Sequence, residues 1–228
     1  MIGKTWYSSE GSKAREFWTI LHLPYTLMAL SFLAIGFGIG GVRDWNAFLL
    51  TAAAYFLGLG IAAHCFDQIE GMGSRYVKIL TDGDLIITGA VALVGAVAIG
   101  TYLIASRGLS HLLWIIPLQV FFVFSYPLAK WFKGAFHTDF WFAVSFGVIP
   151  VLAGSYINSS SFDNPIPLAL WAAVTFLVAL IEITLSRYVR QMRKEQVDTR
   201  FRVKPELALQ LLCFLSYTLA IVVVVVNL

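Results

Sequence analysis

The residues best suited to chemistry include a short polar series at the end of an apolar segment, "IAAHCFDQIEGMGSRY" (61–76). His64, Asp67 and Glu70 are spaced by three, which brings each neighbouring pair roughly onto one face of a helix. An imidazole and two carboxylates in this arrangement either hold a ligand or mark a helix end that reaches water. The segment alone leaves both interpretations open.

A second polar series lies inside another apolar segment. Glu182, Ser186 and Arg190 are spaced by four and form one stripe on a helix. An ionisable residue within a membrane span is costly and is by default a functional candidate. The alternative for Glu182 is an ion pair with Arg187 or Arg75 that holds two helices together. Arginine forks suit phosphate oxygens, so Arg187 and Arg190 could face a phosphorylated substrate.

Other polar residues carry weaker signals. The segment "YPLAKWFKG" (126–134) follows an apolar stretch and is a third polar cluster. We expect His22 to be structural and His137 to lie at a membrane interface. The basic residues from 193 to 204 are typical of an anchor that touches anionic lipid headgroups.

The elements that position these residues are membrane spans. The chain has 228 residues, of which 59% are hydrophobic and 13% charged, with a mean hydropathy of +0.79. A soluble domain carries about a quarter charged residues, so the composition predicts an integral membrane protein. Cys65 and Cys213 lie in apolar runs without metal-ligand spacing, which argues against a disulfide framework or a zinc site.

We predict an all-α, polytopic transmembrane bundle that forms one domain over residues 1–228, because a span needs about 20 apolar residues. The seven predicted spans are roughly 17–41, 46–66, 84–105, 111–128, 139–157, 167–186 and 206–227.

The distribution of lysine and arginine predicts the orientation. With the N-terminus in the cytoplasm, 14 of the 16 Lys and Arg residues fall in cytoplasmic segments, and only Arg43 and Arg107 fall outside. Cytoplasmic loops of membrane proteins carry this excess. We therefore expect a cell inner or plasma membrane protein with a cytoplasmic N-terminus and its polar site on the cytoplasmic side. The last predicted span has no lysine, which removes the attachment point of a retinal protein.

This layout resembles the UbiA superfamily of intramembrane prenyltransferases. In that family an Asp-rich motif, NDxxDxxxD, follows the second span and another follows the sixth, with a Y-x-P-L-K-like segment ending the fourth. The matching segments here are "AHCFDQIEG", "SYPLAKWFKG", the Gly-rich "FGVIPVLAG" of the fifth span and "IEITLSRYVRQ". The resemblance covers most of the chain and implies a UbiA-like helical fold.

The chain departs from the family pattern inside both motifs. Ala63 replaces the Asn, His64 replaces the first Asp, and Asp67 keeps the central Asp. Glu70 stands one residue before the last acidic position. In the second motif Glu182 keeps one acid. The chain therefore resembles a divergent branch of the superfamily with degenerate Asp-rich motifs.

The resemblance implies a transferase that takes a polyprenyl diphosphate and a lipophilic or aromatic acceptor, with Mg²⁺ holding the diphosphate. The catalytic and metal-binding candidates are then Asp67, Glu70 and Glu182. The candidates for substrate binding are His64, Arg75, Tyr126, Lys130, Ser186, Arg187 and Arg190. The isoprenoid chain would lie against aromatic residues such as Phe121, Phe122 and Phe124.

The alternative is a non-catalytic protein on the same scaffold. It would bind a lipid or a quinone, or serve as a subunit of a larger membrane complex. The lost acidic positions favour it, as does the count of seven spans where the family usually has nine. A transporter lacks support, since no inverted repeat is visible. The expected partners are membrane lipids, an isoprenoid diphosphate, and a second copy or a membrane-complex partner, with no nucleic acid.

Overall fold

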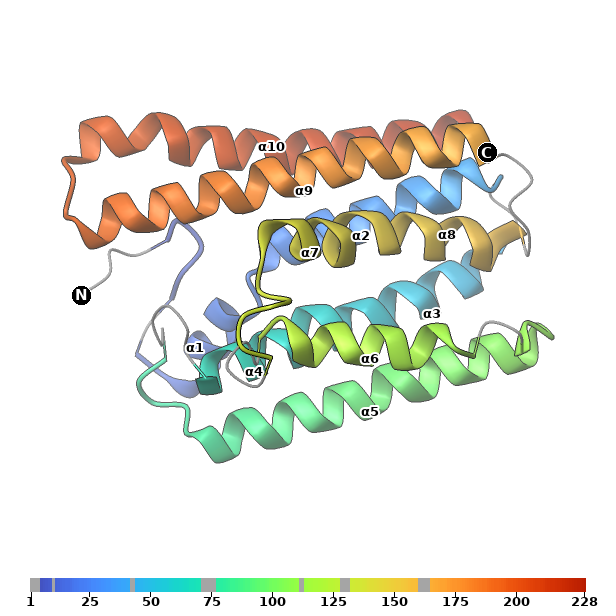
Figure 1. The fold of residues 1–228 in the computed structure, drawn as a ribbon, viewed down its shortest axis with the longest axis horizontal. Helices are drawn as coiled ribbons and strands as arrows, with labels where there is room; N and C mark the ends of the chain where they lie inside the picture. Colours follow the sequence, from blue (N-terminus) through green and yellow to red (C-terminus); the bar gives the residue numbers. More distant parts are fainter. Residues whose placement is uncertain are drawn as a thin grey trace.

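A computed structural model describes residues 5–9, 11–41, 44–70, 77–110, 113–127, 132–159 and 165–228. Over these residues the chain is helical and contains no strand. Its helices run between two ends of an elongated bundle (Figure 1). The prediction of an all-α fold is confirmed for the described part of the chain.

Several helices have the length and apolarity of membrane spans. Five pass this test by length and composition: 45–69, 82–106, 139–158, 165–194 and 199–226. The bent pair 13–20 and 23–39 would make a sixth. Large apolar side chains on the bundle surface are exposed, among them Val91, Ile166 and Leu215 at 68%, 72% and 65%. Such a surface suits contact with lipid.

The first predicted span, 17–41, is divided by a bend. Helix α1 (Lys13–Ile20) meets α2 (Leu23–Ile39) at an angle of 42°. His22 has a left-handed backbone, with φ 42°, and Pro24 occupies the first turn of α2. Proline has no amide hydrogen to continue the hydrogen bonds of α1, and its ring clashes with the carbonyl four residues earlier in a continuous helix. It is accepted in the first turn of a helix, so α1 ends and a new helix begins here.

Two spans each contain a π-helical segment. The second span consists of α3 (Trp45–Tyr55), the π-helical η1 (Phe56–Ala63) and α4 (His64–Glu70). The fifth consists of α7 (Asp139–Ala143), the π-helical η3 (Val144–Val148) and α8 (Ile149–Ser159). π-Helical turns are rare and often occur at functional sites.

The remaining helices are α5 (Asp82–Ser106), α6 (Ile115–Ser125), α9 (Pro165–Lys194) and α10 (Thr199–Val226). The fourth predicted span, 111–128, corresponds to α6. With 11 residues, α6 is about 16 Å long and does not reach the length of a span. Residues 111–112 and 128 lie outside the described part of the chain.

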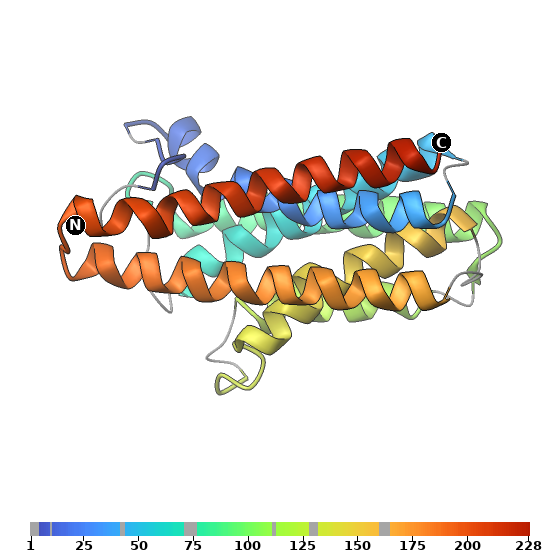
Figure 2. The same cartoon turned by 90° about the horizontal axis from the view of Figure 1, so that it is seen from above.

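Helix α2 is the centre of the bundle because its small residues let two neighbours approach. It packs against α8 and α10, and α9 runs beside α10 (Figure 2). A Cβ added at Gly36 would lie less than 3.0 Å from the carbonyl oxygen of Val151, and one at Gly154 would lie equally close to that of Leu33. Small residues at membrane helix interfaces allow this close backbone packing.

Polar contacts hold the ends of these helices. The Nδ2 of Asn158 donates to the carbonyl oxygens of Phe37, at 3.0 Å, and of Gly41. At the opposite end, Arg193 binds Glu206 with Nε–Oε1 3.0 Å and Nη2–Oε1 2.9 Å, joining α9 to α10.

Candidate functional site

The two polar series predicted from the sequence line one cavity of about 470 Å³. It lies between α4, the start of α2, the α6–α7 region and α9. The predicted residues that line it are His64, Asp67, Tyr126, Glu182, Ser186, Arg187 and Arg190. The side chain of Glu70, and all of Arg75 and Lys130, lie outside the described part of the chain. Every predicted site residue with a described side chain therefore lines this cavity.

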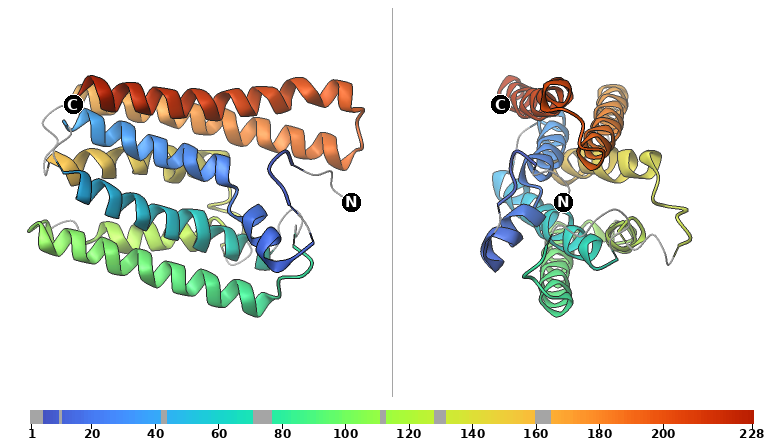
Figure 3. Two further views of the ribbon diagram at one scale, coloured as in Figure 1. Left: turned by 180° about the vertical axis from the view of Figure 1, so that it is seen from behind. Right: turned by 90° about the vertical axis from the view of Figure 1, so that its left-hand side faces the viewer.

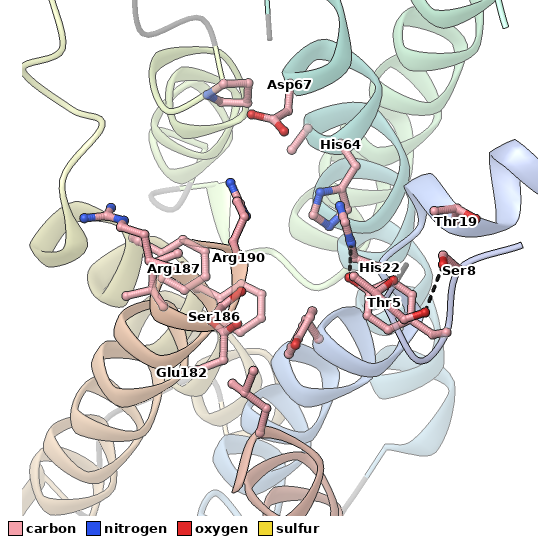
Figure 4. Close-up of a pocket in the computed structure, with 18 of the residues that line it drawn as sticks. Thr5, Ser8, Thr19, His22, His64, Asp67, Glu182, Ser186, Arg187 and Arg190 are labelled. Carbon is pink, nitrogen blue, oxygen red and sulfur yellow. Dashed lines mark hydrogen bonds between the residues drawn. The ribbon is translucent and has the colours of Figure 1, made fainter. Parts of the chain in front are cut away.

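The spacing within each of the two polar series places its residues on the side of a helix that lines the cavity. Helix α4 carries His64 and Asp67 one turn apart, and they face Arg190 of α9 across the cavity, whereas the head of Arg187 points away from them (Figure 4). Glu182 lies two turns before Arg190 on the same helix. The π-helical segments also contribute wall residues, including Leu59 from η1 and Ser145 from η3. The site is thus assembled from helices far apart in sequence.

Glu182 is the most deeply placed charged residue of the site. It is 3% exposed, and its Oε2 has no hydrogen-bond partner within the described residues. The guanidinium of Arg190 interacts electrostatically with both Glu182 and Asp67. A buried carboxylate oxygen without a partner is costly, so this atom is available to a ligand or a cation.

Arg187 does not pair with Glu182. Its Nη2 lies 2.5 Å from Oδ1 of Asp139, at the start of α7, and its side chain is 51% exposed. No ion pair of Glu182 occurs in the part of the chain that the structure describes, so the predicted alternative of a Glu182–Arg187 lock is not found. Arg187 lies at the rim of the cavity, whereas Arg190 is half-buried within it.

Tyr126 is held by His137, a residue that we expected to lie at a membrane interface. The rings of Tyr126 and His137 stack with centroids 4.5 Å apart, and Nδ1 of His137 lies 2.9 Å from the carbonyl oxygen of Tyr126. Both residues line the cavity. His137 therefore positions the wall formed by the end of α6.

The N-terminal part of the site was not predicted from the sequence. Residues 5–9 line the cavity, and the hydroxyl of Tyr7 lies 2.6 Å from Nδ1 of His22. His22 in turn packs edge-on against His64, with ring centroids 4.7 Å apart. His22 thus has a structural role, as expected, but it also lines the site. Arg193 likewise lines the cavity and is 7% exposed, which contradicts its predicted contact with lipid headgroups.

Hydrogen bonds between its backbone and the side chain of Thr19 hold this N-terminal segment, which lies across one end of the bundle (Figure 3). The amide of Ser9 donates to Oγ1 of Thr19 at 2.8 Å, and that hydroxyl donates to the carbonyl oxygen of Ser9 at 2.9 Å. Glu16 accepts three amide hydrogens, from Lys78, Ile79 and Leu80, at 2.8–2.9 Å. No local sequence motif indicated that α1 would anchor the loop before α5.

Replacing Tyr7 by phenylalanine is expected to loosen residues 5–9. A hydrogen bond contributes about 1 kcal/mol, so amide hydrogen exchange in this segment should speed up roughly fivefold while exchange in α2 and α8 stays unchanged. Exchange followed by mass spectrometry measures this. The control is Tyr102→Phe on α5, where the side chain is 62% exposed. Equal rates of amide hydrogen exchange in residues 5–9 of wild type and Tyr7→Phe would contradict the role of the Tyr7 hydroxyl in holding this segment.

The described carboxylates would fit a magnesium ion only together with a substrate. No group of three His, Cys, Asp or Glu side chains able to hold a metal occurs within the described residues. Asp67 and Glu182 line the same cavity, and Glu182 has an unpartnered oxygen. Mg²⁺ commonly binds through one or two carboxylates plus substrate phosphates and waters. The donor set suits such a shared ion rather than one held by the protein alone.

A second, apolar cavity of about 260 Å³ adjoins the first. It lies among α3, η1, α5, α6 and α8. The residues that line both cavities are Leu59, Ala63, Phe122 and Ser145. Of the aromatic residues proposed to contact an isoprenoid chain, Phe122 lines both cavities, while Phe124 stacks on Phe66 with centroids 5.0 Å apart. A charged cavity and an apolar cavity therefore lie side by side and share part of their walls.

Comparison with known families, with curated proteins and with solved structures gave no match for this chain.

Proposed function

We propose that this protein is a UbiA-like membrane prenyltransferase that acts on a polyprenyl diphosphate and a lipophilic or aromatic acceptor. One observation carries the proposal: a cavity lined by three arginines and three carboxylates adjoins an apolar cavity through shared wall residues. A diphosphate suits the first cavity, because guanidinium groups bind phosphate oxygens well. The lipophilic parts of the substrates suit the second.

The reaction would break the bond between the allylic carbon and the diphosphate oxygen. The diphosphate leaves with the electron pair, the acceptor forms a new bond to the carbon, and the acceptor releases a proton. Arg190 and Arg187 would stabilise the negative charge that grows on the leaving diphosphate. Asp67 and Glu182 are the cavity carboxylates able to take up the proton. When bound, Mg²⁺ would add positive charge at the diphosphate.

The second candidate is a non-catalytic protein that binds an anionic lipid or a quinone, or that serves as a subunit of a membrane complex. The specific observation in its favour is the small number of carboxylates. Three described carboxylates line the cavity, but Glu16 already accepts three backbone amides, which leaves Asp67 and Glu182, both within the electrostatic influence of Arg190. Such a site can bind an anionic headgroup without catalysing a reaction on it.

The proposal includes a membrane orientation. One end of the bundle holds helix α1, the turn between α9 and α10 and the start of α7 (Figure 1). The polar cavity is lined there by residues of α1, α4 and α9. This end carries most of the described Lys and Arg residues, while Arg107 lies after the opposite end of α5. Such an excess supports a cytoplasmic location in the inner or plasma membrane for the polar site.

Binding of geranylgeranyl diphosphate to purified protein tests the proposal. With Mg²⁺ present, Asp67→Asn and Glu182→Gln are each expected to weaken binding by about tenfold, because a carboxylate ligand is lost. In EDTA the same variants should bind at least as tightly as wild type, because a negative charge facing the diphosphate is gone.

Comparing binding with Mg²⁺ and in EDTA distinguishes the transferase from the non-catalytic protein. Asp198→Asn, at the exposed turn between α9 and α10, is the matched control and should leave both affinities unchanged. Metal-independent binding in wild type, together with equal affinities for all variants, would contradict the transferase. Binding without release of diphosphate, at any acceptor concentration, would favour the non-catalytic candidate.

A further inference from the structure

The apolar cavity contains one polar pair that its function as a hydrocarbon site does not explain. Nε2 of Gln119, on α6, donates to the hydroxyl oxygen of Tyr55, at the end of α3, over 2.8 Å. Both side chains are half-buried and both line the cavity. A polar group in an apolar environment is costly unless it is hydrogen-bonded, so each atom of this pair requires a partner.

The pair leaves hydrogen-bonding capacity unused. The Tyr55 oxygen accepts from Gln119, but no described group accepts the Tyr55 hydroxyl hydrogen, and none donates to Oε1 of Gln119. The pair therefore offers two donor hydrogens, the Tyr55 hydroxyl hydrogen and the second Nε2 hydrogen of Gln119, and one acceptor, Oε1 of Gln119. If the amide nitrogen and oxygen exchange places, Gln119 offers the donors and Tyr55 the acceptor, so the balance is the same.

Two other hydroxyl groups in this cavity, those of Thr51 and Ser145, have partners on their own helices. Oγ1 of Thr51 donates to the carbonyl oxygen of Ala47 at 2.7 Å, and Oγ of Ser145 donates to that of Phe142 at 3.2 Å. These bonds satisfy the donors locally, as is usual for Ser and Thr in membrane helices. The Tyr55–Gln119 pair joins two different helices instead, and its free groups are left to the cavity.

The Tyr55–Gln119 pair lies close to the junction between the apolar cavity and the polar cavity. Leu59 follows Tyr55 by four residues and Phe122 follows Gln119 by three, and both of these residues line the two cavities. Tyr55 and Gln119 therefore lie about one helical turn, or roughly 5 Å, beyond the junction. A group bound to the pair would be surrounded by apolar side chains but would remain close to the charged cavity.

We propose that the Tyr55–Gln119 pair binds the hydroxyl group of a lipophilic alcohol inside the apolar cavity. A hydroxyl group both accepts and donates, so it can accept from a donor of the pair and donate to its acceptor at once. A quinone carbonyl or an ether oxygen only accepts and leaves one group of the pair without a partner. A hydrocarbon satisfies neither. The site lies beyond the proposed transfer reaction, because it is formed by α3 and α6 and needs no diphosphate.

Equilibrium binding of three matched probes tests this site in purified full-length protein without diphosphate or metal. The probes are farnesol, farnesyl methyl ether and the corresponding hydrocarbon. Wild type is expected to bind farnesol about tenfold more tightly than the ether, because the ether leaves a buried acceptor unpaired. Tyr55→Phe and Gln119→Leu should each reduce this ratio to near one. Thr51→Val, whose lost hydroxyl already has a partner in Ala47, is the control and should keep the ratio.

The ratio of affinities within one variant does not depend on how much of the protein is folded. Equal binding of alcohol, ether and hydrocarbon by wild type would overturn the proposal and would indicate that water satisfies the pair. A preference for the alcohol that survives in Tyr55→Phe/Gln119→Leu would also overturn it. Because no diphosphate is present, failure here leaves the proposed transferase standing, and failure of diphosphate binding leaves this site standing.

Discussion

Replacing Arg190 by glutamine is expected to weaken the binding of geranylgeranyl diphosphate roughly ten- to a hundredfold. A hydrogen bond to a charged group contributes about 1.5–3 kcal/mol, which corresponds to this range of affinity. Of the three arginines that line the cavity, Arg190 is expected to matter most, because Arg187 is already paired with Asp139 and Arg193 with Glu206. Arg190 instead interacts with Asp67 and Glu182. Equilibrium binding in EDTA measures the effect without a metal contribution.

Two further variants make this result specific. Arg190→Lys keeps the charge but loses the planar fork, so we expect it to recover only part of the affinity. Arg200→Gln removes an equal charge at an exposed position, where Arg200 pairs with Asp198 in the same turn, and should bind like wild type. An Arg190→Gln protein that is folded and binds the diphosphate as tightly as wild type would show that the polar cavity is not the anion site. Equal losses in Arg200→Gln would point to a general charge effect.

Replacing Gly36 or Gly154 by alanine is expected to disrupt the bundle. Each new Cβ would lie less than 3.0 Å from a backbone oxygen on the facing helix, well inside contact distance. A backbone cannot move aside as a flexible side chain can, so α2 and α8 would have to separate. Overpacking commonly costs 1–3 kcal/mol, and we expect a loss of at least about 3 kcal/mol at this double backbone contact.

This loss of stability can be compared with the effect of the same substitution at a glycine where an added Cβ has room. Gly100 on α5 has its nearest neighbour for an added Cβ, Ile116, at 3.9 Å. Gly100→Ala should therefore unfold at the wild-type temperature or slightly above, since alanine favours a helix over glycine. Thermal unfolding of detergent-solubilised protein, followed by the fraction that stays monodisperse, measures all three variants. A Gly36→Ala protein as stable as Gly100→Ala would mean that α2 and α8 are not in close contact.

The helical, membrane-embedded character of the chain and its most notable polar residues follow from local sequence. The length of apolar runs and the cost of a charge in lipid are local properties, so Glu182 and Arg190 could be identified without a fold. Helical periodicity alone is enough to place His64 and Asp67 on one face. These inferences depend only on residues close together in the chain.

Local patterns missed the breaks in helix geometry. The bend at His22 divides a run that reads as one apolar span, although Pro24 was a signal that a new helix could begin there. The π-helical segments that contribute Leu59 and Ser145 to the cavities have no comparable signal. Whether an apolar helix stays regular depends on how its neighbours pack, and hydropathy carries little information about that.

Which polar residues share a site is settled only by the way the helices pack in three dimensions. The packing brings Asp67 and Arg190 to one cavity, pairs Arg187 with Asp139 instead of Glu182, and lays Tyr7 beside His22. It also joins Tyr55 to Gln119 across 64 positions of sequence. Such contacts depend on how whole helices are arranged, because the position of each partner is set by the packing of many other residues. Spacing along a single helix cannot specify them.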